Sequence, residues 1–315
     1  MYQEQPFLSH ANAVFSEIRN TPLESLNTGS FRLGLQDALE AAGKSAGDDP
    51  RQLERLRHVA SSYKVHFLSL EPPVSAPRQA SVYTFDGFPG LCVVRNYLTE
   101  DQCHRLMCQT LCDYINVGCA TLISWDASWG TRTYRGYSPF PDPLVRLTRC
   151  VLSHFDSDYI PDAAIINCYS KSYFLRLHKD DAEETDDCVV NISLGAPAIF
   201  MLGGVDHGTV PVSFVVDSGS VVLMSQSSRF CLHGIVKLLS YNKPGIYHNR
   251  DCPDNGAAAA IPAYAFPKFE KTIPQCPDQA LSGIAPSDRL MSSVQSLSKD
   301  LRVSISIRRA KVRPT

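Results

Sequence analysis

The sequence predicts a mostly β protein with flanking helices, of the α+β class. Three observations support this prediction. Short apolar runs separated by turn residues fill the chain from about residue 163 onward. Apolar residues recur at helical spacing before residue 60, and a proline-rich break lies between the two regions.

The first region is expected to be an N-terminal helical accessory segment over residues 1–80. Apolar side chains recur every three or four residues over 31–39 and again over 53–59. The prolines between 71 and 77 have the character of a linker. At 315 residues the chain has room for one large domain or two modest ones, so we expect a second domain over 81–315.

This second domain is predicted to open with a strand and a helix. The segment PGLCVVRNYL, residues 89–98, has the apolar character of a strand. Thr99 followed by Glu100 and Asp101 has the capping and charge pattern of a helix start, and the helix should run to about Tyr114.

The remainder is predicted to form a double-stranded β-helix, or jelly roll. Many short strands separated by closely spaced turn signals are typical of that architecture. The predicted strands are AAIINCY, YFLRLH, VVNISLG, AIFMLGG, VSFVV, SVVLM, RFCLHGI and RVSISIRRAKV. A stretch rich in Pro, Gly, Ser and Ala at about 241–300 is expected to be an insertion before the last strand.

Composition sets further bounds. The 30 Lys and Arg residues nearly balance 32 Asp and Glu residues, and 44% of the chain is hydrophobic. These values exclude a disordered chain, a collagen-like repeat and a strongly basic histone-like binder. The acidic run over 180–187 is expected to be a solvated loop that could also favour cation loading, and the basic residues from 308 to 313 could contact phosphates.

The expected location is cytoplasmic or nuclear, with the mitochondrion as an alternative. No apolar run approaches the roughly 18 residues that a membrane span needs. The N-terminal residues lack the apolar core of a signal peptide, and Glu4 and Glu17 are unusual in an import presequence, so we expect no secretion. The 11 cysteines are odd in number and scattered, as expected of free thiols in a reducing compartment.

Three residues are candidate metal ligands: His178, Asp180 and His233. Side chains at i and i+2 of a strand point to the same face, so His178 and Asp180 can converge on one point. The predicted strand RFCLHGI could bring His233 alongside. Two imidazoles and one carboxylate on one side of a metal are typical of non-haem Fe(II) oxygenases. Alone the pattern is weak, since a strand end and a hydrogen-bonded core histidine would look the same.

The last predicted strand adds a second candidate site. Arg302, Ser304, Ser306 and Arg308 alternate with aliphatic residues, and the two arginine Cα atoms should lie about 20 Å apart along the strand. Their long side chains could lean inward and bind the two ends of a short dicarboxylate through bidentate hydrogen bonds. An edge strand that shows a polar face to water is the alternative.

Together these motifs resemble the AlkB family of Fe(II)/2-oxoglutarate-dependent dioxygenases. The resemblance lies in His178-x-Asp180, His233 and the pair Arg302 and Arg308. It extends over IINCYSKSYFLRLHKD, VNISLGAPAIFMLGG, DSGSVVLMSQSSRFCLHGI and RVSISIRRA, and covers about the last three-quarters of the chain. The segments YSPFP and MLGG are most similar to the first eukaryotic AlkB homologue branch. The first 80 residues lie outside the resemblance.

The resemblance implies roles for individual residues. His178, Asp180 and His233 would bind Fe(II) and carry the catalysis. Asn167, Tyr169, Arg302, Ser304 and Arg308 would bind the co-substrate 2-oxoglutarate. Arg302 would hold the distal carboxylate, and Arg308 would lie near the carboxylate at the metal. A lid of aromatic side chains over the substrate base is implied at Trp125, Trp129, Tyr134 and Tyr137.

At two positions the sequence differs from the family pattern, which limits what the resemblance implies about this chain. Bacterial AlkB has an acidic residue two positions after the ligand aspartate, where this chain has Ala182, so base preference is not inherited. Ser304 replaces an asparagine of the co-substrate strand, which weakens that contact without abolishing it.

The implied function is oxidative removal of N-methyl groups from DNA or RNA bases, with Fe(II), O2 and 2-oxoglutarate. N6-methyladenine in DNA and methylated bases in tRNA are the leading candidates. A methylated base inside a duplex cannot reach a buried iron, so the substrate should be single-stranded or flipped out. Three alternatives stay open: the same iron chemistry on a protein, a non-catalytic nucleic-acid-binding module, and a zinc hydrolase, which would not need the two arginines.

Overall fold

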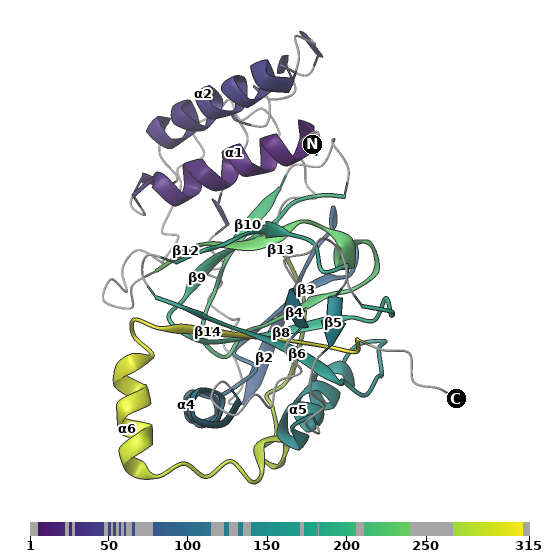
Figure 1. Ribbon diagram of the computed structural model, residues 1–315, viewed down its shortest axis with the longest axis vertical. Helices are drawn as coiled ribbons and strands as arrows, with labels where there is room; N and C mark the ends of the chain where they lie inside the picture. Colours follow the sequence, from purple (N-terminus) through teal and green to yellow (C-terminus); the bar gives the residue numbers. More distant parts are fainter. Residues whose placement is uncertain are drawn as a thin grey trace.

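The computed structural model describes residues 6–22, 29–46, 65–66, 78–114, 123–125, 132–134, 140–170, 173–181, 183–205, 211–239 and 267–310, with isolated positions between 25 and 60. Within these residues two sheets face each other and enclose an interior (Figure 1). This is the predicted jelly-roll core with flanking helices.

The smaller sheet has five strands, in the order β1 (Val65–His66), β10 (Val212–Val216), β9 (Ala198–Leu202), β12 (His233–Leu238) and β7 (Leu175–His178). The larger sheet has seven, in the order β13 (Pro267–Pro274), β2 (Gln79–Phe85), β3 (Leu91–Arg95), β11 (Val221–Met224), β8 (Val189–Gly195), β14 (Arg302–Arg308) and β6 (Ala163–Tyr169). A separate hairpin joins β4 (Ile123–Trp125) to β5 (Arg132–Tyr134). All pairings are antiparallel except that of β1 with β10.

Alternation along the strands distributes the apolar side chains among three clusters. On β9, Phe200 faces the interior between the sheets, whereas Ile199 and Met201 face outward. On β3, Val93 faces the interior and Val94 faces the opposite side of the larger sheet. Because successive strand residues point to opposite faces, both sheets need a cover on their outer faces.

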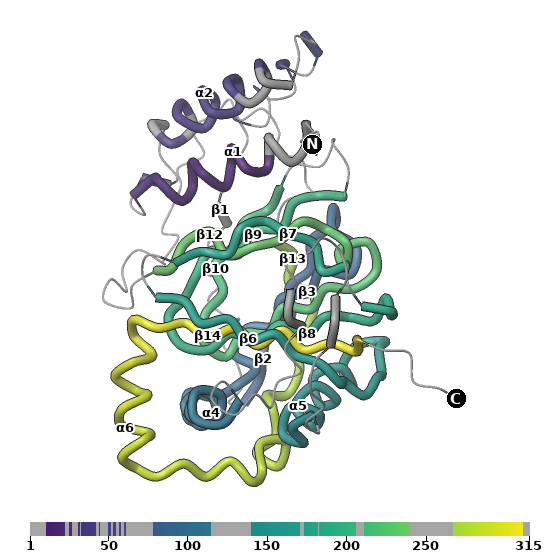
Figure 2. Tube along the Cα trace, viewed as in Figure 1, coloured from purple at the N-terminus to yellow at the C-terminus, as the bar shows by residue number. Residues whose placement is uncertain are grey.

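Helices supply those covers (Figure 2). The helix α1 (Pro6–Asn20) packs on the outer face of the smaller sheet, and α2 (Gly29–Ala46) packs on α1. The helices α4 (Glu100–Gln109), α5 (Asp142–Leu152) and α6 (Asp288–Leu297) cover the larger sheet. None of the described helices is both long enough and apolar enough to cross a membrane.

The predicted helix after Thr99 is confirmed. The Thr99 hydroxyl accepts a hydrogen bond from the Gln102 backbone N–H, and the Gln102 side chain accepts one from the Thr99 N–H. This reciprocal cap satisfies two amides that the helix leaves without partners. After Gln109 the chain continues through a π-helical turn, Thr110–Tyr114, to the predicted end of the helix.

Most predicted strands are present, with some differences, and the short strands β1, β4 and β5 were not predicted. β12 begins at His233 rather than at Arg229, because Gln226–Phe230 forms a 3₁₀ helix. β2 and β13 were not predicted; β13 lies within the stretch expected to be an insertion and pairs with β2 at the edge of the larger sheet. Most β13 side chains are exposed, so the strand has little apolar alternation to detect.

Part of the predicted domain organisation falls on residues that the structure does not describe. The proline-rich break and residues 240–266 lie outside the described residues, as does part of 53–59. The division into a segment over 1–80 and a domain over 81–315, with an insertion at about 241–300, stays a prediction.

Candidate metal centre and co-substrate pocket

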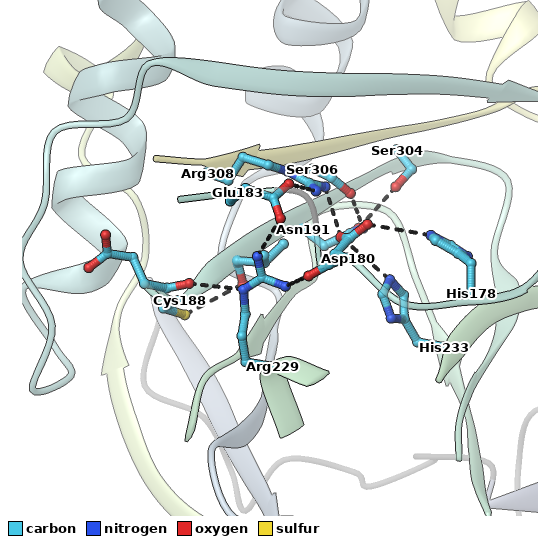
Figure 3. Close-up of polar contacts among 12 residues, drawn as sticks. His178, Asp180, Glu183, Cys188, Asn191, Arg229, His233, Ser304, Ser306 and Arg308 are labelled. Carbon is cyan, nitrogen blue, oxygen red and sulfur yellow. Dashed lines mark hydrogen bonds and ion pairs between the residues drawn. The ribbon is translucent and has the colours of Figure 1, made fainter. Parts of the chain in front are cut away.

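The three candidate metal ligands meet at one end of the smaller sheet (Figure 3). His178 is the last residue of β7 and lies directly across from His233, the first residue of β12. Asp180 follows β7 by two residues, and its carboxylate faces the edges of both rings. Its carboxylate oxygens lie 3.7 Å from His178 Nε2 and 3.7 Å from His233 Nε2. One ligating atom from each residue lies within 4.8 Å of the other two.

Backbone contacts fix which imidazole nitrogens face the centre. His178 Nδ1 lies 2.9 Å from the Arg176 carbonyl oxygen, and His233 Nδ1 lies 3.2 Å from that of Cys231. A carbonyl only accepts, so each Nδ1 carries the proton and donates it. Each Nε2 therefore presents its lone pair toward Asp180, which is the tautomer that a metal requires.

Burial and neighbouring charges act in opposite directions on this cluster. Burial alone would raise the pKa of Asp180, but Arg308 and the nearby histidines hold it well below its usual value. Burial lowers the pKa of His233 to about 4 despite the adjacent Asp180 carboxylate. At neutral pH the pair is therefore a carboxylate beside a neutral imidazole, which are both in the state that binds a metal ion.

One face of three adjacent strands, β8, β14 and β6, forms the interior surface beside the triad. On β14, Arg302, Ser304, Ser306 and Arg308 all face the interior, and all four are buried. The register places Arg302 beside Tyr169 and Ser304 beside Asn167 on β6. On the other side of β14 lie Ser193 and Asn191 of β8. The prediction that both arginines face the interior is confirmed, and the alternative of an edge strand is wrong, because β14 pairs on both sides.

Ser304 and Ser306 are linked through Asn191. The Ser304 hydroxyl donates to Asn191 Oδ1 at 3.0 Å, and Asn191 Nδ2 donates to Ser306 Oγ at 2.7 Å. Asn191 and Ser193 were not predicted as site residues. The signal that could have found them is the alternation of Asn and Ser with aliphatic residues in VVNISLG.

Arg302 lies at the end of this interior surface away from the histidines. Its guanidinium is fully buried and donates to Ser193 Oγ at 2.8 Å and to the Ala196 carbonyl at 3.4 Å. Burial lowers its pKa to about 10, so the group stays cationic at neutral pH. Within the described residues, Arg302 Nε, Arg308 Nε and the Tyr169 hydroxyl are buried without a hydrogen-bond partner. Buried polar atoms that lack partners are costly, so an anion that accepts from them would be stabilised here.

Arg308 occupies the other end and contacts the triad itself. Its Nη2 lies 2.9 Å from Asp180 Oδ2, and its Nη1 donates to Glu183 Oε1 at 2.7 Å. Burial alone would lower the pKa of Arg308, but Asp180 and Glu183 raise it.

The solvated-loop expectation for the acidic run holds for the exposed Asp181, Glu184 and Asp186 but is wrong for Asp180 and Glu183, whose side chains are buried against Arg308 at the end of β14. Arg308 is buried against Asp180 and Glu183, and Arg309 Nε lies 2.6 Å from Asp187 Oδ2. Arg308 is buried and so does not face an external phosphate, whereas the Arg309 side chain stays 34% exposed. Lys311 and Arg313 lie outside the described residues. Glu183 and its second partner Arg229 were missed, because a charged loop usually indicates a solvated surface.

The remaining predicted residues are only partly placed. Asn167 is half-buried on β6. Trp125 and Tyr134 lie on paired strands of the β4–β5 hairpin, across from Arg132 and Ile123. Trp129 and Tyr137 lie outside the described residues. The prediction of an aromatic lid therefore stays a prediction.

The donor set fits Fe(II) with 2-oxoglutarate. Two imidazoles and one carboxylate form the three-ligand set of non-haem Fe(II) oxygenases. The buried guanidiniums, the Tyr169 hydroxyl and the Ser306 hydroxyl offer donors for a dicarboxylate on the same interior surface.

Comparison with known proteins agrees with this chemistry. A model of the 2OG-Fe(II) oxygenase superfamily matches residues 90–259, a range that includes the whole triad. Among solved structures, one titled "The structure of OsALKBH1" covers 70% of this chain and 98% of its own, at 19% identity and a TM-score of 0.43.

Curated relatives share shorter segments. "DNA N(6)-methyladenine demethylase ALKBH1A" from Arabidopsis thaliana is 34% identical over 119 residues, which are 36% of this chain and 34% of that protein. "Nucleic acid dioxygenase ALKBH1" from Homo sapiens is 29% identical, over 37% of this chain and 31% of that protein. "Alpha-ketoglutarate-dependent dioxygenase AlkB" from Escherichia coli is 38% identical over 82 residues, which are 26% of this chain and 38% of that protein.

The chain spans between about a third and just over half of the length of the first relatives that it matches. The resemblance to AlkB-type proteins is confirmed by these similarities. The match to the family model covers more than half of the chain and brings with it the cofactors Fe(II), 2-oxoglutarate and O2. The chain therefore belongs to the 2OG-Fe(II) oxygenase superfamily.

Proposed function

We propose that the protein is an oxidative demethylase that removes N-methyl groups from bases in DNA or RNA. N6-methyladenine in DNA and methylated bases in tRNA are the leading candidates. Relatives named as nucleic-acid demethylases support this substrate class. The observation that carries the proposal is the meeting of His178, Asp180 and His233 beside a strand face that holds two buried guanidiniums.

In this proposal His178, Asp180 and His233 hold Fe(II). Arg302 and Tyr169 bind the distal carboxylate of 2-oxoglutarate, since they lie at the end of the pocket away from the histidines. Arg308 lies beside Asp180 and orients the carboxylate nearest the metal. Asn167 and Ser304 lie between the two ends; Asn167 donates a hydrogen bond to the co-substrate, and Ser304, whose hydroxyl donates to Asn191, packs beside it.

When bound, Fe(II) with 2-oxoglutarate and O2 supplies the oxidising power that hydroxylates an N-methyl carbon. The N-hydroxymethyl product releases formaldehyde and leaves an N–H, while 2-oxoglutarate leaves as succinate and CO2. The protein contributes the positions of the groups and a pocket that excludes water.

The substrate is proposed to approach from the side of His178. The His178 side chain is 36% exposed, whereas those of His233 and Asp180 are 6% and 8% exposed. This difference gives the centre one open side. A flipped or single-stranded base would enter there, with Trp125, Trp129, Tyr134 and Tyr137 as candidates for stacking against it.

The test is formaldehyde release from a panel of oligonucleotides and tRNA that carry single methylated bases. We expect release from at least one methylated nucleic acid, and its loss in His178→Ala and Arg308→Ala proteins. His154→Ala and Arg289→Ala are matched controls, because both residues lie outside the pocket. Thermal unfolding of each variant separates loss of the site from loss of the fold.

The outcomes also distinguish the alternatives. Release of formaldehyde from a methylated peptide but from no nucleic acid would replace the proposal with a protein substrate. Nucleic-acid binding without conversion of 2-oxoglutarate would identify a non-catalytic module. Full activity in both site variants would refute the assigned roles. The location in the cytoplasm or nucleus, or in the mitochondrion, stays a prediction that imaging of the tagged full chain tests.

A further inference from the structure

A closed ring of four charged side chains extends from Asp180 on the side away from the two histidines (Figure 3). The ring runs from the Asp180 carboxylate to Arg308, then to Glu183, then to Arg229, and returns to the Asp180 backbone carbonyl. Two carboxylates and two guanidiniums leave it with no net charge. Only Asp180 among the four is a candidate metal ligand.

Glu183 is the residue that joins the two arginines. Its Oε1 accepts from Arg308 Nη1 at 2.7 Å, and its Oε2 lies 2.8 Å from Arg229 Nη2. Its side chain is 1% exposed, so both contacts are shielded from water. Burial alone would raise the pKa of Glu183, but the two arginines lower it, so it is a carboxylate at neutral pH.

Arg229 fixes the backbone of the same loop. Its guanidinium is 1% exposed and donates to the carbonyl oxygens of Asp180 and Asp187 as well as to Glu183. One rigid side chain therefore holds both ends of the loop after β7. The loop is also tied to the end of β14, since the Glu184 N–H donates to the Ala310 carbonyl at 2.9 Å.

The charge balance of the ring bears on metal binding. Arg308 contacts one oxygen of Asp180, the same carboxylate that the metal needs. A guanidinium with no other partner would compete with the cation for this carboxylate and would repel it. Glu183 binds the opposite edge of Arg308 and offsets its charge, so that Asp180 stays available to a cation.

We propose that Glu183, supported by Arg229, is a positioning residue. The two side chains hold Arg308 and the Asp180 backbone and thereby raise the affinity of the centre for a divalent cation. The inference rests on the proposed function, because it concerns the same centre. It predicts effects of opposite sign for the two ligands. Neutralising Glu183 makes the pocket more positive, which weakens binding of a divalent cation and does not weaken binding of a dianion.

The experiment compares the full-length wild type with Glu183→Gln, which keeps the size of the side chain and removes its charge. Co(II) is titrated calorimetrically into metal-free protein, and 2-oxoglutarate is then titrated at saturating Co(II). We expect the Co(II) dissociation constant of the variant to rise about 10- to 100-fold, as for other residues that orient metal ligands. The 2-oxoglutarate dissociation constant should stay the same or fall.

Asp186→Asn is the matched control, because Asp186 is an exposed acid of the same loop and its variant should bind Co(II) as the wild type does. If Glu183→Gln does not fold, Arg229→Lys provides the second test. A lysine keeps the charge but cannot contact Glu183 and both carbonyls at once, so Co(II) binding should again weaken.

Three results would overturn the inference. Unchanged Co(II) affinity in Glu183→Gln would show that Glu183 does not tune the centre. Equal weakening for Co(II) and for 2-oxoglutarate would indicate a structural role alone. A wild type that binds no Co(II) would refute the proposed function and the inference with it, whereas wild-type binding together with either of the first two results refutes the inference alone.

Discussion

Gly234 allows a test of how closely β7 and β12, the strands that carry His178 and His233, must approach each other. It follows His233 on β12, where the pairing with β7 is irregular. A Cβ atom at this position would lie 2.5 Å from the Leu175 carbonyl oxygen and 3.1 Å from that of Arg176. Ordinary contact begins at 3.4 Å, so β7 would have to move by about 0.9 Å.

Gly234→Ala is therefore expected to damage the metal centre as well as the fold. His178 lies at the end of β7 and would move with it, whereas metal–ligand distances tolerate only about 0.2 Å of change. We expect the Co(II) dissociation constant to rise at least tenfold. Forcing a methyl group into a packed site should also cost about 1–3 kcal/mol of unfolding free energy. Calorimetric Co(II) titration and urea unfolding measure the two effects.

Gly34→Ala is the matched control. A Cβ atom there would also meet a close neighbour, at 2.4 Å, but this neighbour is the end of the flexible Glu17 side chain. The carboxylate can move aside, and alanine favours the helix by about 0.5–1 kcal/mol over glycine. We expect unchanged or higher stability and unchanged Co(II) affinity. The reasoning is refuted if Gly234→Ala behaves like this control.

Two further predictions concern buried groups. Arg302→Met should weaken 2-oxoglutarate binding at saturating Co(II) about 10- to 100-fold, because charge-assisted hydrogen bonds are lost. The Co(II) affinity should stay unchanged. An equal loss of both affinities in calorimetry would contradict the placement of Arg302 at the distal carboxylate. Burial raises the pKa of Cys188 to about 12 from its ordinary value of 9.0. The stability that the protonated thiol provides is therefore complete below pH 9 and is lost as pH rises toward 12. The free energy of unfolding should fall by about 1.4 kcal/mol per pH unit in this range. Urea unfolding between pH 8 and about 10.5 should therefore show a shallower decline for Cys188→Ala than for the wild type, and parallel declines would refute the cause.

The ligand set could be predicted from sequence because its signal is local. His178 and Asp180 are two residues apart at the end of a strand, and the alternation in RVSISIR places both arginines on one face whatever the strand pairs with. Both patterns are the same whichever residues the strand pairs with. By contrast, the direct pairing of His233 with His178 depends on how β12 aligns with β7, which no local pattern encodes.

The parts that could not be predicted depend on contacts distant in sequence. Glu183 has the sequence surroundings of a solvated acid, and only the position of β14 against the loop shows that its side chain is buried. β13 is similarly hidden, since an exposed edge strand has no buried face to impose alternation. Ion pairs and edge strands are properties of the assembled sheet rather than of a segment.

The position of β14 in the larger sheet has a consequence for synthesis. β14 lies between β8 and β6, yet it follows every other strand of that sheet in the chain. While the polypeptide emerges from the ribosome, β8 and β6 have no direct partner in each other, and the acidic loop after β7 has no arginine from β14 to neutralise it. The nascent chain must therefore leave the position between β8 and the edge strand β6 unfilled until residues 302–308 arrive. A premature stop a few codons before them would remove both guanidiniums and leave two strand edges exposed to chaperones and proteases.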